Sequence, residues 1–242
     1  MLLAVAWRFI PNVGINEMCG RFTLVKPSKI NFNRVGESGL PLFPRYNIAP
    51  SQMILAIADF GAGIEWSSLS WALIPSWSKD GKGFINARGE TLEEKASFSE
   101  SFKERRCLIP ADGFFEWRRA GRAKQPFYFQ LNDERPFAFA GVWDRWNNKG
   151  TFVISCAIIT TEANELLRPI HDRMPVILQP DAYEAWLDPK TDPVVLKRLL
   201  QPFPASEMKS YPVGSAVNYP DNDNAEIIVR VDAERGTTPS LF

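Results

Sequence analysis

The sequence predicts an α+β protein: a single domain with a curled, mostly antiparallel β-barrel-like core and a few short helices. Short β-rich runs between turn residues outnumber the helix signals. Strands and helices do not alternate regularly, as they do around a parallel sheet. The chain holds 19 prolines in 242 residues, above the usual share of about 5%, and this disfavours a helical bundle.

The expected strands are runs of branched and aromatic residues bounded by Gly, Pro, Asn or Asp. In chain order they are residues 20–25, 53–58, 64–71, 107–117, 127–131, 137–142, 152–159 and 174–178. Thr91 and Glu94 form a capping-box pattern that predicts a helix running toward Arg105. Shorter helices are expected at 162–168, from Asp181, and at 194–200, where Asp192-Pro193 is a typical helix start.

Composition excludes several classes of protein. Lys plus Arg is 28 and Asp plus Glu is 28, so net charge does not indicate a nucleic-acid binder. Residues 103–124 nevertheless hold seven basic and three acidic residues, which indicates either a positive face or a solvated hairpin. No stretch approaches the about 18 apolar residues of a membrane helix. We therefore expect a cytoplasmic, monomeric protein that does not bind membranes.

Cysteine and histidine usage argues against metal chemistry and disulfides. The three cysteines (Cys19, Cys107 and Cys156) are odd in number and form no C-x-x-C pair. One histidine excludes a His-cluster metal site. We expect a reducing compartment, no metal and no cofactor.

We expect three segments: residues 1–18 as a leader or a mis-assigned start, 19–231 as the domain, and 232–242 as a polar tail. The first 18 residues lack a basic region and a cleavage site, and their apolar run stops at Arg8, so they do not read as a secretory signal. If translation starts at Met18 and that Met is removed, Cys19 carries a free α-amine beside its thiol. The ordinary pKa of such an amine is about 7.7–8.0, so part of it is neutral and nucleophilic at pH 7. The alternative is a buried structural cysteine.

Three further stretches place polar side chains in apolar or turn-rich settings. His171 lies between Pro169 and Pro175, and its ordinary pKa near 6.5 suits proton transfer. Glu116 lies on an aromatic strand, where an acid is costly unless paired or protonated. Asn86 and Arg88 share one face of an extended segment, where an amide and a guanidinium can hold a phosphate. The alternatives are a packed histidine, an outward-facing acid, and a turn Asn before a surface Arg.

Together these stretches resemble the SRAP family, the abasic-site processing proteins once named SOS-response-associated peptidases. The collinear motifs extend from Cys19 to about Val231, in the family's order: MCGRF, YNIAPSQ, WALIPSW, INARGET, RCLIPADGFFEW, FAFAGVWD, IITT and IHDRMPVIL. Gly89 stands where Ser or Ala is commoner in the family, and we expect little effect.

The resemblance implies the SRAP fold and a function in the DNA damage response. It implies binding of single-stranded DNA that contains abasic sites, a thiazolidine crosslink to the lesion, cleavage of the protein's own leader, abasic-site lyase character, and nucleoid association when bound to DNA. The implied catalytic residues are Cys19, Asn86, Glu116 and His171. The implied DNA-binding residues are Arg21, Arg88, Arg173, Trp71, Trp77 and Pro50.

Two functions of other classes are also considered. One is a cysteine peptidase or N-terminal-nucleophile hydrolase using Cys19, His171 and Glu116, which would turn over peptides without DNA. The other is a non-covalent single-strand binding module, in which Cys19→Ala would bind as the wild type does, with steep salt dependence.

Overall fold

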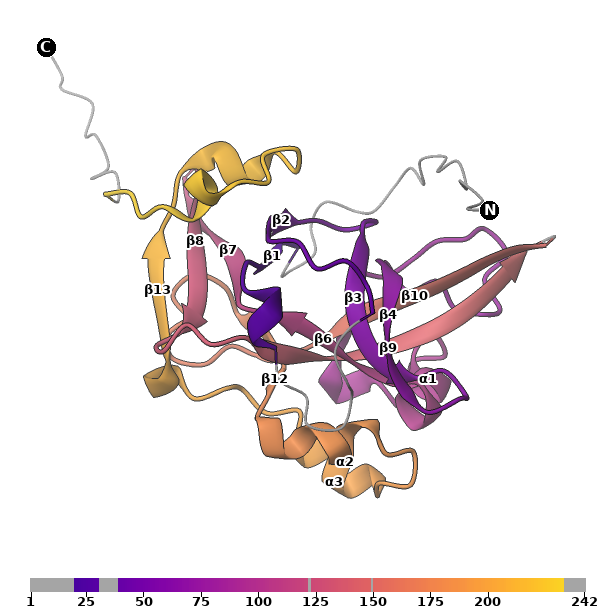
Figure 1. The fold of residues 1–242 in the computed structure, drawn as a ribbon. Helices are drawn as coiled ribbons and strands as arrows, with labels where there is room; N and C mark the ends of the chain where they lie inside the picture. Colours follow the sequence, from indigo (N-terminus) through magenta and orange to yellow (C-terminus); the bar gives the residue numbers. More distant parts are fainter. Residues whose placement is uncertain (1–19, 31–38, 122, 149, 233–242) are drawn as a thin grey trace, which may run out of the picture.

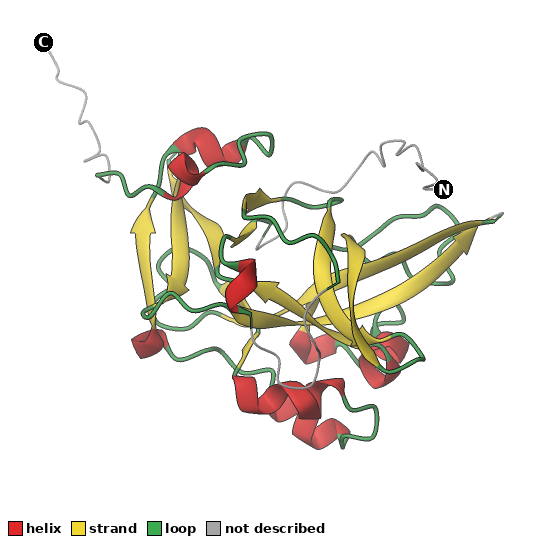
Figure 2. Ribbon diagram, in the orientation of Figure 1, coloured by secondary structure: helices red, strands yellow, loops and turns green. Residues whose placement is uncertain are grey.

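The computed structural model describes residues 20–30, 39–121, 123–148 and 150–232. Within these residues β-strands dominate and the helices are short (Figure 2). The strands are β1 Phe22–Leu24, β2 Arg45–Ile48, β3 Met53–Asp59, β4 Ile64–Trp71, β5 Asn86–Arg88, β6 Arg106–Ala111, β7 Gly113–Ala120, β8 Ala123–Leu131, β9 Phe137–Asn148, β10 Thr151–Glu162, β11 Arg173–Pro175, β12 Ile177–Leu178 and β13 Met208–Pro212. The α-helices are α1 Ser99–Glu104, α2 Tyr183–Leu187 and α3 Pro193–Arg198.

Five strands close into a barrel. The pairings run β10–β4–β3–β6–β9, and β9 pairs again with β10. Closure occurs at Cys156, which lies opposite Trp71 of β4 in a parallel pair and opposite Trp143 of β9 in an antiparallel pair. Only the β10–β4 and β10–β5 pairings are parallel within the described sheets. The expected mostly antiparallel, barrel-like core is therefore confirmed.

A second sheet, β13-β8-β7-β1-β2, stands beside the barrel (Figure 1). The chain passes between the two sheets at Asp112, so the expected strand 107–117 is in fact two strands, β6 and β7. The Asp112 carboxylate accepts hydrogen bonds from Thr23 Oγ1 (2.6 Å), Val25 N (2.6 Å) and Lys26 N (2.7 Å). These bonds fix the corner, because a buried carboxylate needs such donors.

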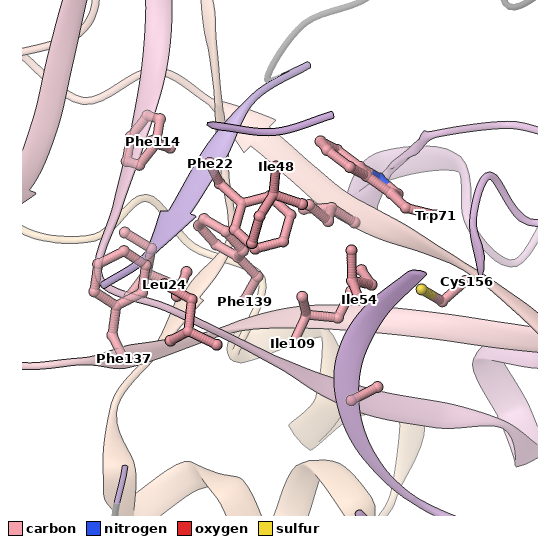
Figure 3. Packing of buried hydrophobic residues seen from close by; sticks show 14 of the residues in the cluster. Phe22, Leu24, Ile48, Ile54, Trp71, Ile109, Phe114, Phe137, Phe139 and Cys156 are labelled. Atoms are coloured by element: carbon pink, nitrogen blue, oxygen red, sulfur yellow. The ribbon is translucent and has the colours of Figure 1, made fainter. Parts of the chain in front are cut away.

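One apolar core joins the two sheets. Phe22 of β1 meets Trp71 of the barrel at a ring distance of 5.1 Å and Phe139 at 5.8 Å, both edge to face. Figure 3 shows Phe22 and Leu24 among side chains of the barrel strands, with Phe114 on the other side. Short β1 is thus packed from both sheets, and this packing positions the chain immediately after Cys19.

The helices differ most from expectation. The helix expected from Thr91 begins only at Ser99, after a 3-10 turn at Gly89–Thr91 and further turns. Leu92, Phe98 and Phe102 are buried along this path, so tertiary packing outweighs the capping-box signal. The region 162–168 forms the end of β10 and turns, and Asn164 Oδ1 accepts from Leu166 N and Leu167 N there.

Candidate functional site

Strand β1 lies between β2 and β7, and this placement sets the geometry at the start of the domain. Phe22 is opposite Phe114 of β7, and Phe115 N donates to Arg21 O at 3.0 Å. Continuing this antiparallel register brings Gly20 opposite Glu116. Glu116 is only 3% exposed. Cys19 lies outside the described residues, but it is bonded to Gly20.

Strand β5 carries the predicted pair Asn86 and Arg88 beside β10. Asn86 lies opposite Ile158 and Arg88 opposite Thr160. Trp71 Nε1 donates to Ile85 O at 2.9 Å, which fixes the backbone just before Asn86. The extended segment expected here is confirmed, with Asn86 half-buried and Arg88 exposed.

Arg173 of β11 connects three elements of the site. Its Nη2 donates to Thr160 O on β10 (2.8 Å) and to Glu90 Oε2, after β5 (2.7 Å), and its Nη1 contacts the other oxygen of Glu90. The hydrogen bond from Arg173 holds the pKa of the Glu90 carboxyl below its ordinary value. Bidentate pairing of this kind fixes both partners, so Arg173 joins β5, β10 and β11.

His171 precedes this strand and is partly exposed. Arg173 N donates to His171 Nδ1 at 3.1 Å, and Asp172 Oδ1 lies 2.9 Å from the same nitrogen. Burial lowers the pKa of His171; Asp172 opposes this, and the charges of Arg119 and Arg173 add to it. The two contacts act in opposite senses, since the bond from Arg173 N needs an unprotonated Nδ1 and the Asp172 carboxylate favours a proton on it. Arg119 lies on β7, the strand that carries Glu116, so the charge by which it lowers the His171 pKa acts from that strand.

The predicted aromatic surface is only partly at the surface. Trp77 is 60% exposed, with its Nε1 donating to Ala96 O at 3.2 Å. Pro50 is half-buried, at the turn where Ser51 adopts φ 68° and its N donates to Trp71 O. Trp71 itself has no exposed area. It cannot line a bound strand in this structure, and it positions β5 from within the core.

Arg21 has protein partners for much of its guanidinium. Nη1 donates to Asn47 Oδ1 (3.1 Å) and to Val217 O, and Nη2 donates to Asn218 O (3.2 Å). Burial lowers its pKa from the ordinary value. The side chain expected to hold a phosphate is thus bound to the C-terminal segment.

The basic stretch 103–124 divides into two halves. Arg106 is buried and donates to carbonyl groups of Trp186 and Asp188, each at 2.7 Å. The other half is an exposed β7–β8 hairpin, in which Arg119 lies opposite Lys124. Arg118 lies over the Phe127 ring at 4.9 Å, and Phe127 is the cross-strand neighbour of Glu116.

The structure therefore gathers two sets of predicted residues. Asn86, Arg88, Arg173 and His171 lie on or beside β5, β10 and β11, and Glu116 lies on β7 next to β1. Sequence reasoning missed Asn47, Glu90, Arg119 and Asp223. Asn47 and Glu90 lie inside the motifs YNIAPSQ and INARGET, which was the available signal.

Within the described residues no helix is long and apolar enough to span a membrane. Nor do three or more His, Cys, Asp or Glu side chains of that part of the chain gather as a metal site would require.

The closed barrel and the second sheet share one core and form an α+β domain. Acidic, amide and basic side chains lie around the start of this domain. The model of the family SOS response associated peptidase (SRAP) matches residues 18–220. The chain belongs to this family.

Relatives and solved structures agree with this assignment. The abasic site processing protein YoqW of Bacillus subtilis is 46% identical over 222 residues, covering 87% of this chain and 99% of that protein. The abasic site processing protein HMCES of Xenopus tropicalis is 31% identical over 82% of this chain and 69% of its own. A crystal structure of a Bacteroides thetaiotaomicron protein matches with TM-score 0.79 at 29% identity, over 88% of this chain and all of the other. The family and fold predictions are thus confirmed.

Proposed function

We propose that this chain processes abasic sites in single-stranded DNA by trapping the lesion covalently on Cys19. The observation that supports the proposal is the register of β1 against β7, in which Phe22 lies opposite Phe114. Continued by two residues, this register would bring Gly20 opposite the buried Glu116. The residue bonded to Gly20 is a cysteine whose α-amine and thiol would both be free after removal of Met18. The names of the curated relatives supply the substrate.

The reaction is balanced without an oxidant or a reductant. The open form of an abasic sugar carries an aldehyde at C1′, to which the neutral α-amine of Cys19 adds. Loss of one water gives an imine. The thiol sulfur then adds to the imine carbon, its proton passes to the nitrogen, and a five-membered thiazolidine closes.

The surrounding side chains supply proton transfer and orientation. Glu116 would donate the proton with which the hydroxyl leaves as water, and would take it back on reversal. His171, whose pKa is lowered by burial, would carry a proton to or from the sugar during ring opening. Asn86 would orient the sugar through its amide.

Basic and aromatic side chains would hold the strand. Arg88 would contact a phosphate, and the exposed ring of Trp77 and the turn at Pro50 would lie against bases. Arg173, whose guanidinium is paired with Glu90 and Thr160 O, would hold β5 and β11 in place beside them. Arg118 would add a cation on the β7–β8 hairpin. Arg21, held by carbonyl groups of the C-terminal segment, would contribute little to phosphate binding.

The mechanism needs a free amine on Cys19. An acylated nitrogen cannot form the imine, so residues 1–18 must be absent. Either translation starts at Met18 and that Met is then removed, or the protein itself removes the leader. The family match that begins at residue 18 supports such an N-terminus. Lyase character would follow from the same imine, whose formation acidifies the adjacent carbon and permits β-elimination.

A denaturing gel tests this proposal. Single-stranded DNA with one abasic site is incubated with the 242-residue chain, with protein expressed from Met18, and with Cys19→Ala made in that shorter form. Cys107→Ala, which alters a buried barrel cysteine, is the matched control. We expect a covalent band from the Met18 form and from Cys107→Ala, but none from Cys19→Ala. The absence of a band from folded, DNA-binding Met18 protein would favour the binding module, and turnover of peptides without DNA would favour the peptidase.

A further inference from the structure

We infer that residues 215–228, here called the C-terminal cap, position the nucleophilic end of the chain, and that Asp223 and Asn47 are the positioning residues. This inference rests on the proposed function. The cap comprises two 3-10 turns, Ser215–Asn218 and Ala225–Ile228, and the residues between them. It lies beside β7 and β8 in Figure 1.

The cap is fastened to β2 by Asp223. Its Oδ1 accepts from Asn47 N (3.0 Å) and from Tyr46 N, and its Oδ2 pairs with Arg45 Nε at 2.5 Å. One carboxylate thus receives two backbone donors and a guanidinium, which is a strong and directional arrangement. The path of the cap over β2 is thereby set.

The buried side chain of Asn47 also binds the cap. It has no exposed area, and its Nδ2 lies within hydrogen-bond distance of Val217 O (3.2 Å), Tyr219 O (2.9 Å) and Asn222 O (3.0 Å). Its Oδ1 accepts from Arg21 Nη1. A single buried amide therefore joins the cap to the side chain that stands two residues after Cys19.

Arg21 completes the connection. Its guanidinium reaches the cap through Val217 O and Asn218 O, while its backbone oxygen accepts from Phe115 of β7. The cap thus holds the side chain of Arg21, and the strand that carries Glu116 holds its main chain. Val217, fully buried, and Ile227 pack the cap on Phe115 and Tyr128 of that sheet.

Loss of the cap contacts should change the rate of crosslinking more than the affinity for DNA. If the cap holds Arg21, it fixes the direction in which the chain leaves β1 toward Cys19, and hence the distance between the amine and Glu116. A misplacement of about 1 Å can slow a positioned reaction on the order of 100-fold. The DNA contacts proposed for Arg88 and Trp77 lie elsewhere, so binding of the strand should persist.

The test compares variants of the Met18 form by crosslinking rate at saturating abasic DNA and by Kd for the same DNA. Asp223→Ala and Asn47→Ala should lower the saturated rate about tenfold or more while Kd stays within about twofold. Asp223→Asn keeps one acceptor oxygen, so its saturated rate should lie between those of wild type and Asp223→Ala. This variant keeps the inference testable where an alanine variant fails to fold. Asp221→Asn is the matched control, since it removes a charge from the same cap at an exposed carboxylate that forms no ion pair with the described residues.

A second readout separates positioning from a general loss of structure. Formaldehyde diffuses freely to a 1,2-aminothiol, so its adduct at Cys19, followed by intact mass, should form at the wild-type rate in Asp223→Ala. Equal saturated crosslinking rates in wild type, Asp223→Ala and Asn47→Ala would overturn the inference and leave the proposed function standing. A weakened Kd with an unchanged rate would also overturn it. Absence of any crosslink in the wild type would instead overturn the proposed function.

Discussion

At the scale of single residues, His171 offers the clearest electrostatic test, because it is the chain's one histidine and gives one set of imidazole signals in an NMR titration. Burial lowers its pKa, and Arg119 lowers it further. We predict a value below the ordinary 6.5. Arg119→Ala should raise this pKa, since a neighbouring positive charge disfavours the imidazolium. Asp172→Asn should lower it, since a negative neighbour is lost.

Arg118→Ala is the control for this titration. It removes the same charge from the adjacent position of the hairpin, whose guanidinium lies over Phe127, and it is not among the causes of the shift at His171. We expect it to leave the His171 titration within error of wild type. A His171 pKa at or above 6.5 in the wild type would contradict the assigned environment.

The types of the site residues could be predicted from sequence, but several contacts could not. Arg173 was expected at a phosphate, and nothing local in the sequence shows that Glu90, distant in the chain, accepts two of its hydrogen bonds. Trp71 was expected to contact DNA, and nothing local in the sequence shows that it is buried. Aromatic residues near a turn serve cores and binding faces alike, and only the closure of the barrel over Trp71 decides between them.

At the scale of elements, the corner between β6 and β7 depends on Asp112. Asp112→Ala would leave three donors, of Thr23, Val25 and Lys26, without their acceptor. We predict a loss of about 2–4 kcal/mol in the free energy of unfolding, measured by urea denaturation. Asp133→Ala, which removes an exposed ion pair with Arg135, should cost less than about 1 kcal/mol. Equal small effects would mean that the corner is held by packing alone.

The Glu90–Arg173 pair predicts a pH dependence of stability. The folded state lowers the pKa of Glu90, so the stabilisation is present above the ordinary pKa of about 4.3 and is lost as pH falls through the folded value. Glu90→Gln should therefore destabilise by about 0.5–1 kcal/mol at pH 7, with the difference from wild type shrinking toward zero in acid.

Glu94→Gln serves as the comparison for Glu90→Gln. It removes an exposed carboxylate four residues along the chain that forms no ion pair with the described residues, and it should show no such pH-dependent difference. A Glu90→Gln penalty that persisted unchanged well below pH 3 would show that packing of the side chain, rather than its charge, stabilises this region.

Elements were predicted where their signal was local and strong. Strands 53–58 and 64–71 were found because they alternate and are bounded by turns, and β3 and β4 pair as neighbours. Strands β2 and β13 were missed, since RYNI and MKSYP are short and partly polar. Such strands are recruited by partners far away in the chain: β2 pairs with β1, and β13 with β8.

At the scale of the whole molecule, the sequence predicted a barrel-like core but not which strands pair to close it. The ring depends on β10 meeting both β4 and β9 at Cys156, and such distant pairings have no local signature. The family resemblance supplied what periodicity did not. It indicated that motifs far apart in sequence belong to one site. The structure places Asn86 on β5 and Arg173 on β11, both strands paired with β10, with His171 just before β11.

The packing of the two sheets explains why the reaction is expected at the start of the domain. The barrel and the second sheet share the core around Phe22, and the chain enters that core from Cys19. The C-terminal cap returns to the same place through Arg21. The two ends of the domain thus meet beside the strand of Glu116, where the proposed crosslink would form.

The most direct test of this account is the intact mass of the product between Met18-form protein and single-stranded DNA with one abasic site, followed by peptide mapping of the adduct. We predict the summed mass of protein and DNA less one water, unchanged by borohydride because the imine has closed to a thiazolidine, with the adduct on Cys19. Cys19→Ser should give an adduct only when borohydride traps the imine. An adduct mapped to another residue, or no adduct from folded protein, would contradict the account.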